Sequence, residues 1–428
     1  MALLPVRGTS RTLLVKKPHQ GKMIAQRRFL VCHPTGNTFV RALLQELESQ
    51  ELLQKYYTTL GIGEEANPLM KRLFGLRAYS IRSERLSCQW FPETFRLLPW
   101  RNKSQEERRR QVDRSYHALD QKVSRILGSA QGGILHAYED GAAKSFRRAK
   151  DHGILCSYEL PIAHWTTVRK LLAEEAERLP EWEPTLESTR EPEEKLARKQ
   201  EELLLADRIT CPNEFVLRSL PLEIRKKKPC LVAPFGSPDF SPPPKKRADG
   251  KILKLLFVGS MSQRKGLADL MKAMELIDSP SISLSILGQP SMPMSFYRSN
   301  LSSFRYLSPR SNKEVRKVMQ EHDVLILPSI VEGRALVQQE ALACGLPLVV
   351  TENAGGEDLI DEAETGFLVP IRQPQAIAEK IEWFAANKKL LPEMSDFAQQ
   401  KASLYRWKDY AMAIIGFCLR NKLPNTDN

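Results

Sequence analysis

The feature that most constrains the fold is a strand, turn and helix followed by a second strand within residues 323–366. Apolar residues at 324–327 predict a buried strand, and good helix formers at 335–344 predict a helix after the intervening turn. Gly345 ends that helix, and a second apolar strand begins at Leu348. Such a unit is typical of an open α/β sheet, in which ligands bind where strands run into the following helices.

Two carboxylates, Glu332 and Glu340, flank the start of this predicted helix. They would lie about 12 Å apart if the helical rise held throughout, which is the order of distance between the two sugars of a nucleotide-sugar. Unsatisfied backbone N–H groups at the helix start favour a phosphate between them. Taken alone, the pair also fits the exposed surface of an ordinary helix.

The same alternation of strands and helices occurs through the rest of the chain. Further strands are predicted at 28–32, 133–138, 153–158, 207–211 and 231–235, and 56–59 is an additional candidate. Helices follow several of these strands, so we expect a parallel, doubly wound sheet. The charged region from 66 to 125 has helical periodicity, and we expect it to form helices that cover the sheet.

A segment rich in proline and charge, SPDFSPPPKKRADG at 237–250, separates two such series of strands. It has little to bury and is predicted to link two domains. We therefore expect a basic flexible tail at 1–26, a first domain at 27–236 and a second domain at 251–404. Ligands are usually held in the cleft between two such domains.

Composition describes a globular chain, with 42% hydrophobic and 27% charged residues. No run of about 18 apolar residues predicts a membrane-spanning helix, and the basic N-terminus lacks the apolar core of a signal peptide. We therefore expect a cytoplasmic protein. The seven cysteines are scattered without a CxxC pair, which favours a reduced compartment over a disulfide framework or zinc site.

The net charge of +13 is the unusual part of the composition. Basic clusters occur at 108–110, 147–148, 225–228 and 245–247. No nucleic-acid-binding motif accompanies them, so we expect no nucleic acid partner. An anionic membrane surface or a phosphate-bearing acceptor fits better, and ordinary solvated helix faces remain the alternative.

Several motifs in the second half occur in a fixed order. They are KLLFVGSMSQRKGLADLMKAM from Lys254 to Met274, EGRALVQQE from Glu332, EALACGLPLVV from Glu340, and GGEDLIDEAETGFLVP from Gly355. Together they resemble the donor site of the retaining glycosyltransferases of family 4, which have the GT-B fold. The resemblance extends from about Lys254 to Tyr410.

This resemblance implies an α/β protein of the GT-B fold, with two Rossmann-like, doubly wound parallel-sheet domains facing a central cleft. The apolar C-terminal helix within 405–422 is then expected to pack back on the first domain. It also implies that Glu332 hydrogen-bonds the donor sugar and Glu340 the ribose, while Arg264 and Lys265 clamp the diphosphate. Arg334 is unusual for the family, and we expect it either to contact phosphate or to point to solvent.

The resemblance and the strand-end positions together define the rest of the predicted site. The donor-binding residues are completed by Gly36, Gly259, Gly333, Ala335, Leu336 and Val337. His136 is the candidate acceptor-activating group, since it belongs to a strand that should open into the cleft. The other acceptor-side candidates, at two strand ends and just beyond, are Tyr138, Glu139, Asp140, Glu159 and His164.

The leading hypothesis is therefore a retaining hexosyltransferase that uses a nucleotide diphosphate sugar and a glycan or lipid-linked acceptor, in cell-surface polysaccharide or glycolipid synthesis. No DxD triad is present, so we expect neither a required metal nor another cofactor. We further expect peripheral contact with the inner face of the membrane. Two alternatives stay open: another nucleotide-sugar or sugar-phosphate enzyme on the same fold, and a non-catalytic scaffold that binds an anionic partner.

Overall fold

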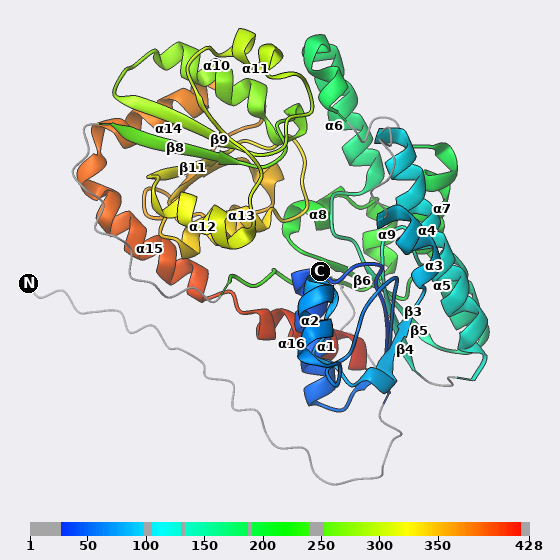
Figure 1. Cartoon of the computed structure of the whole chain (residues 1–428). Coiled ribbons are helices and arrows are strands. Elements are labelled where there is room, and N and C mark those ends of the chain that lie inside the picture. The colour runs from blue at the N-terminus through cyan, green and yellow to red at the C-terminus, as the bar shows by residue number, and fades with distance from the viewer. Residues whose placement is uncertain (1–26, 98–104, 130–132, 187–190, 239–251, 421–428) are drawn as a thin grey trace, which may run out of the picture.

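Two parallel sheets, each covered by helices, make up the computed structural model (Figure 1). It describes residues 27–97, 105–129, 133–186, 191–238 and 252–420. The predicted tail at 1–26 and all but the first two residues of the predicted linker at 237–250 lie outside these described residues. No described helix combines the length and apolar character needed to cross a membrane.

The first sheet has seven strands in the order β3-β2-β1-β4-β5-β6-β7, and every paired strand is parallel. Their bounds are β1 (Phe29–Cys32), β2 (Leu53–Thr58), β3 (Leu86–Cys88), β4 (Ile134–Tyr138), β5 (Leu155–Glu159), β6 (Arg208–Cys211) and β7 (Cys230–Val232).

The second sheet has six parallel strands in the order β10-β9-β8-β11-β12-β13. They are β8 (Leu253–Val258), β9 (Ile282–Leu287), β10 (Arg305–Leu307), β11 (Val324–Leu327), β12 (Leu348–Val350) and β13 (Gly366–Leu368). In both sheets the strand order reverses once, between β1 and β4 and between β8 and β11. Ligands of doubly wound sheets bind at these topological switch points.

Helices cover both faces of the first sheet. The described helices of the first domain are α1 (Thr38–Ser49), α2 (Pro68–Phe74), α3 (Trp90–Leu97), α4 (Gln105–Ile126), α5 (Ala143–Asp151), α6 (Trp165–Arg178), α7 (Glu193–Leu205), α8 (Glu214–Ser219) and α9 (Leu222–Lys227). The C-terminal helix α16 (Trp407–Leu419) packs beside α1, where Tyr410 and Ile414 join the same buried cluster as Phe39. On the other face, Val123 of α4 and Phe146 of α5 share a second cluster.

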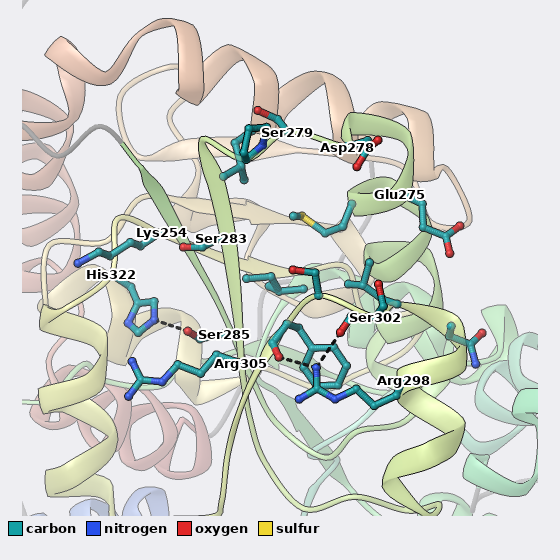
Figure 2. Close-up of a pocket in the computed structure, with 18 of the residues that line it drawn as sticks. Lys254, Glu275, Asp278, Ser279, Ser283, Ser285, Arg298, Ser302, Arg305 and His322 are labelled. Atoms are coloured by element: carbon teal, nitrogen blue, oxygen red, sulfur yellow. Dashed lines mark hydrogen bonds between the residues drawn. The ribbon is translucent and has the colours of Figure 1, made fainter.

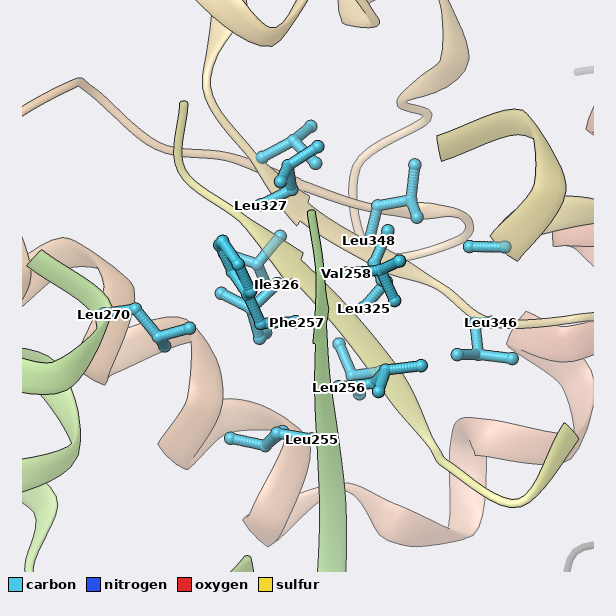
Figure 3. Packing of buried hydrophobic residues seen from close by; sticks show 14 of the residues in the cluster. Leu255, Leu256, Phe257, Val258, Leu270, Leu325, Ile326, Leu327, Leu346 and Leu348 are labelled. Atoms are coloured by element: carbon cyan, nitrogen blue, oxygen red, sulfur yellow. The ribbon is translucent and has the colours of Figure 1, made fainter. Parts of the chain in front are cut away.

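The second domain is built around near-continuous apolar strands, as expected for parallel strands buried on both faces. Figure 3 shows Phe257 of β8 beside Ile326 of β11 on one face of the sheet, and Val258 of β8 beside Leu348 of β12 on the other. Its helices are α10 (Leu267–Ile277), α11 (Met294–Asn300), α12 (Asn312–Gln320), α13 (Leu336–Ala343), α14 (Pro374–Ala386) and α15 (Leu391–Ser403).

The predicted doubly wound parallel architecture is confirmed, and most predicted elements agree within a few residues. The strand expected at 324–327 is β11, and the helix expected at 335–344 is α13. One prediction was wrong, because the region 66–125 is not entirely helical: β3 lies within it. This strand has only three half-buried residues at the sheet edge, which is too short for an alternating pattern to emerge.

Candidate functional site

The carboxyl ends of β8 and β11 bring two loops together at the switch point of the second sheet. A hydrogen bond from the Ile330 amide to the Arg264 carbonyl, 2.9 Å long, joins the loops directly. Gly266 ends the short 3-10 turn Gln263–Lys265 in the left-handed region, with φ of +72°. A Cβ there would lie 1.9 Å from the Pro328 carbonyl oxygen, so this close approach requires glycine.

Glu332, Arg264 and Lys265 form one buried charged cluster between these loops. One carboxylate oxygen of Glu332 accepts from Arg264 Nη1 at 2.6 Å and lies 2.6 Å from Lys265 Nζ. Only 8% of Glu332 is exposed. The cluster holds two cations and one anion, so it carries a net positive charge.

The electrostatics of this cluster keep Glu332 ionised. Burial opposes ionisation, but the Lys265 ammonium and the Arg264 guanidinium outweigh it and hold the pKa of Glu332 below its usual value. Burial lowers the pKa of Lys265, although the Glu332 carboxylate opposes that shift. Gly259, directly after β8, lies beside the Lys265 side chain. A Cβ added at this glycine would lie 3.5 Å from Lys265 Cε.

Arg334 lies just before α13, and Glu340 lies within this helix. Glu340 is half-buried on α13, where burial raises its pKa and the charge of Arg316 opposes the shift. The Arg334 guanidinium is fully buried, and it donates to Asp358 at 2.7 Å and to Gln339 at 3.1 Å. The expectation that Arg334 points to solvent was therefore wrong.

Gly333 marks the contact between the two domains. It forms an isolated antiparallel bridge with Ile162, and a Cβ would lie 1.7 Å from the Pro161 carbonyl oxygen. Asn213 Nδ2 donates to the Gly333 carbonyl at 2.6 Å. The close approach that glycine permits here is therefore made to the first domain's own backbone.

The remaining predicted donor residues, Ala335, Leu336 and Val337, lead from that loop into α13. The Ala335 amide donates to the Ala354 carbonyl at 3.3 Å and is not left for a ligand. Leu336 and Val337 form the first turn of the helix, and both are half-buried.

His136 and Glu159 are brought together, but beneath the C-terminal helix. Nε2 of His136 lies 3.3 Å from Glu159, and Nδ1 lies 3.0 Å from the Ser157 hydroxyl. The Tyr410 hydroxyl of α16 donates to Glu159 at 2.5 Å. Both ring nitrogens of His136 thus have partners, and the network holds α16 on the sheet.

Glu139 and Asp140 face cations of α7. Asp140 pairs with Arg198 and, at 3.2 Å, with Lys195, and its backbone φ is +71°. Burial raises the pKa of Glu139, although Lys199, 3.8 Å away, opposes that shift. These acidic side chains are therefore already paired within the first domain.

His164 directly follows a residue that contacts the charged cluster. It caps α6, and the preceding Ala163 amide donates to the Glu332 carbonyl at 3.4 Å. Burial lowers the pKa of His164 to about 4, so it is neutral at pH 7.

One group at the first switch point escaped the sequence prediction. His33 directly follows β1, stacks edge-on to Tyr138 at 4.5 Å, and has a buried Nε2 with no partner among the described residues. Burial lowers its pKa to about 4. Gly36 lies three residues further on, against the Tyr79 ring. The strand-end position of His33 was the available signal.

A separate cavity lies around the amino ends of β9 and β10. It measures about 1070 Å³ and is lined by side chains of both charges, including Lys254, Arg305 and Glu275. Figure 2 shows His322 turned toward Ser285, with which it hydrogen-bonds at 2.8 Å. This is the sheet edge opposite the carboxyl ends, so the cavity is separate from the charged cluster. Nowhere in the described residues do three or more His, Cys, Asp or Glu side chains gather as metal ligands.

Solved structures similar along nearly the whole chain define the fold class. Sucrose-phosphate synthase from Thermosynechococcus elongatus superposes with a TM-score of 0.65 at 16% identity, over 91% of this chain and 98% of that one. HepE of Anabaena, solved in complex with UDP, superposes with a TM-score of 0.57 at 13% identity, over 91% and 98%. The chain therefore has the GT-B fold, as predicted.

Comparison of the amino-acid sequence with known families adds a family match to this fold class. Residues 241–401 match the model of the glycosyl transferases group 1 family. D-inositol 3-phosphate glycosyltransferase of Corynebacterium urealyticum is 32% identical over 111 residues, which are 26% of this chain and 26% of that relative. The second half therefore contains a glycosyl transferases group 1 domain, and this part of the chain is similar to curated glycosyltransferases. The match spans only about a quarter of that curated relative.

Proposed function

We propose that the chain is a retaining, metal-independent glycosyltransferase that moves a hexose from a nucleotide diphosphate sugar to a glycan or lipid-linked acceptor. The observation that carries the proposal is the cluster of Glu332, Arg264 and Lys265 at the β8–β11 switch point. This cluster lies within the group 1 domain. The UDP complex of HepE supports a nucleotide-sugar donor.

The cluster has the charge that sugar transfer requires. A departing nucleoside diphosphate gains negative charge in the transition state, and preorganised cations in a water-poor site stabilise that charge most strongly. Arg264 and Lys265 provide two such cations, and among the described residues a single carboxylate, that of Glu332, pairs with them. In our proposal, the diphosphate takes their hydrogen bonds and frees Glu332 to accept from donor sugar hydroxyls.

The proposed roles of Glu340 and His164 follow from where these residues lie relative to Glu332. Glu340 lies in α13, the helix that follows the Glu332 loop. It would hold the ribose diol, since a carboxylate can accept hydrogen bonds from two neighbouring hydroxyls. Retention would proceed by departure and attack on one face, with the leaving phosphate accepting the proton from the acceptor. His164 is a better acceptor-side candidate than His136, because the loop before it contacts Glu332 whereas His136 is paired beneath α16. A role in cell-surface polysaccharide or glycolipid synthesis belongs to this proposal.

Two substitutions test the donor site, each with a matched control. Lys265→Met and Glu332→Gln should each lower sugar transfer by about 100-fold or more, because each removes a charge of the cluster that acts in the transition state. Lys272 and Glu275 form an exposed pair on α10, 3.0 Å apart. Lys272→Met and Glu275→Gln should leave transfer unchanged. The measurement is product formation from a panel of UDP- and GDP-sugars with lipid-linked and oligosaccharide acceptors.

The two alternatives give different results in the same assay. A nucleotide-sugar or sugar-phosphate enzyme would convert the donor without any acceptor dependence. A non-catalytic scaffold would show neither conversion nor thermal stabilisation by any nucleotide-sugar, since only ligands that bind the folded chain shift its unfolding. Transfer by Glu332→Gln at the rate of the unsubstituted chain would overturn the site assignment.

A further inference from the structure

Two short helices at one edge of the first sheet expose large apolar side chains. We call this the α2–α3 surface, and it comprises Leu69 and Leu73 of α2 and Trp90, Phe91 and Phe95 of α3. Their exposed fractions range from 56% to 76%. The three aromatic rings of α3 lie together, with centroids 6.1 Å apart for Trp90–Phe91 and 5.1 Å apart for Phe91–Phe95.

The polarity of α3 is the reverse of that of a helix on a water-soluble domain. Such a helix turns its apolar side chains toward the core and its charges toward water. In α3 the one buried residue is Glu93, which is 2% exposed and accepts from Arg77 and Arg96 at 2.5 and 2.6 Å. The aromatic rings face outward instead, and α2 buries no residue at all. Clustered exposed aromatics of this kind mark an interaction surface.

The buried ion pair connects the two helices. Arg77 lies three residues beyond the end of α2, and its partner Glu93 is the fourth residue of α3. Arg77 also donates to the Thr59 hydroxyl just after β2, at 3.0 Å. The exposed side chains of α2 and α3 thus surround one fixed point at the carboxyl ends of β2 and β3.

The surroundings of the α2–α3 surface are basic. From Pro68 to Leu97 the sequence has six Lys or Arg and two Glu. Four of the six basic residues pair with carboxylates, two with Glu93 and two with Glu48. Lys71 and Arg72 in the last turn of α2 are exposed, and neither has an ion-pair partner among the described residues. A partner of this surface must therefore be apolar and anionic at once. A lipid bilayer containing anionic lipids has both properties, and amphipathic helices rich in Trp, Phe and basic residues bind there.

We propose that the α2–α3 surface docks the chain on an anionic lipid bilayer, with the aromatic side chains of α3 at the headgroup level and Lys71 and Arg72 against the lipid charges. This surface contains none of the residues of the basic clusters considered in the sequence, although the cluster at 108–110 lies on α4, which contacts α3. In the other clusters Arg147 pairs with Glu201, and Lys228 donates to backbone carbonyls. The cluster at 245–247 lies outside the described residues.

Docking through this surface places the first switch point near the bilayer. Tyr79, two residues after Arg77, contacts the Gly36 loop that follows β1, and Arg41 of α1 donates to the Ala78 carbonyl at 2.6 Å. The surface and the strand ends of the first domain thus form one connected unit. The docking proposal does not depend on the donor-site assignment, because it uses none of the residues in the charged cluster.

Vesicle sedimentation tests the proposal with the full chain. The chain should bind vesicles of phosphatidylglycerol and phosphatidylcholine but not pure phosphatidylcholine vesicles, and 0.5 M salt should weaken the binding. The double substitution Phe91→Ser with Phe95→Ser should reduce the partition coefficient by about tenfold or more, because two apolar side chains no longer enter the interface. Lys71→Glu with Arg72→Glu should reduce it similarly, but only at low salt.

A matched control and a spectral readout complete the test. Leu404 is 70% exposed in the second domain, so Leu404→Ser should leave vesicle binding unchanged. Tryptophan fluorescence should shift to the blue on vesicle binding, and Trp90→Phe should remove most of that shift while binding persists.

Equal binding to neutral and anionic vesicles would overturn the proposal. So would unchanged vesicle binding by both of the doubly substituted chains. A concentration-dependent dimer that Phe91→Ser with Phe95→Ser abolishes, without vesicle binding, would show instead that a second copy covers this surface. Because these readouts involve no sugar transfer, they stand apart from success or failure of the donor-site experiments.

Discussion

One glycine controls how closely the two loops of the charged cluster can approach. Gly266 combines a left-handed backbone with a position where a Cβ would lie 1.9 Å from the Pro328 carbonyl oxygen. Gly266→Ala should therefore lower the free energy of unfolding by at least about 3 kcal/mol, from backbone strain and displacement of the loop together. It should also reduce sugar transfer, because Arg264 and Lys265 immediately precede it. Urea unfolding followed by circular dichroism measures the first effect.

Gly153 is a close control for that substitution. Its φ is +66°, nearly that of Gly266, but no atom lies within 4 Å of an added Cβ. Gly153→Ala should cost only the left-handed strain, about 1 kcal/mol, and should leave transfer unchanged. Equal destabilisation by the two substitutions would show that the contact with Pro328 is unimportant.

The charged cluster could be predicted at the residue scale, whereas the acceptor side could not. Lys265 and Glu332 follow strands that become neighbours in a doubly wound sheet, so their strand-end positions already place them together. His136, by contrast, is the third of five residues in β4. Its side chain leaves a face of the sheet rather than its end, and α16 covers that face. Which face the last helix would cover is not encoded near His136.

A short 3-10 element of the first domain contributes to the core of the second. Trp182, within Pro180–Thr185, is 1% exposed and packs against Phe296 and Tyr297 with centroids 4.8 and 5.8 Å away. Trp182→Ala should lower the free energy of unfolding by about 3–5 kcal/mol, because it leaves a cavity in the second domain's core. Thermal and urea unfolding of purified protein are the measurements.

Trp90 is the natural comparison for Trp182. It is the same residue type in the same domain but is 59% exposed. In solution without lipid, Trp90→Ala should change the free energy of unfolding by less than about 0.5 kcal/mol. Similar losses from both substitutions would mean that Trp182 does not act through the second domain's core.

At the element scale, apolar periodicity predicted which segments form helices and strands, but it did not predict their contacts with distant parts of the chain. The C-terminal helix was expected from its apolar run and is observed at Trp407–Leu419. The segment Pro180–Thr185 reads as a charged, proline-interrupted stretch, and nothing in it indicates that Trp182 enters another domain. The partner residues lie more than 100 positions away, so only the tertiary arrangement defines this contact.

An ion network joins the two domains of the molecule. Glu175 of α6 is fully buried and accepts from Arg178 at 2.7 Å, from Arg372 of the second domain, and from Gln263 Nε2 at 2.8 Å. Arg178 also donates to Asp269 of α10 at 2.8 Å. Gln263 immediately precedes Arg264, so domain closure and the charged cluster share one loop.

Removing the central carboxylate should therefore open the molecule. Glu175→Ala removes the acceptor that cations of both domains share, although Arg178 keeps Asp269 and Arg372 keeps Glu174. The loss of these hydrogen bonds should cost about 1–3 kcal/mol. We expect a larger radius of gyration by small-angle X-ray scattering, and two unfolding transitions in place of one. Glu193, paired at 2.8 Å with Arg169 on the exposed surface of the first domain, provides the matched control. Glu193→Ala should alter neither quantity, since exposed pairs contribute about 0–1 kcal/mol. An unchanged radius and a single transition for Glu175→Ala would show that apolar contacts such as Trp182 hold the domains together without the ion network.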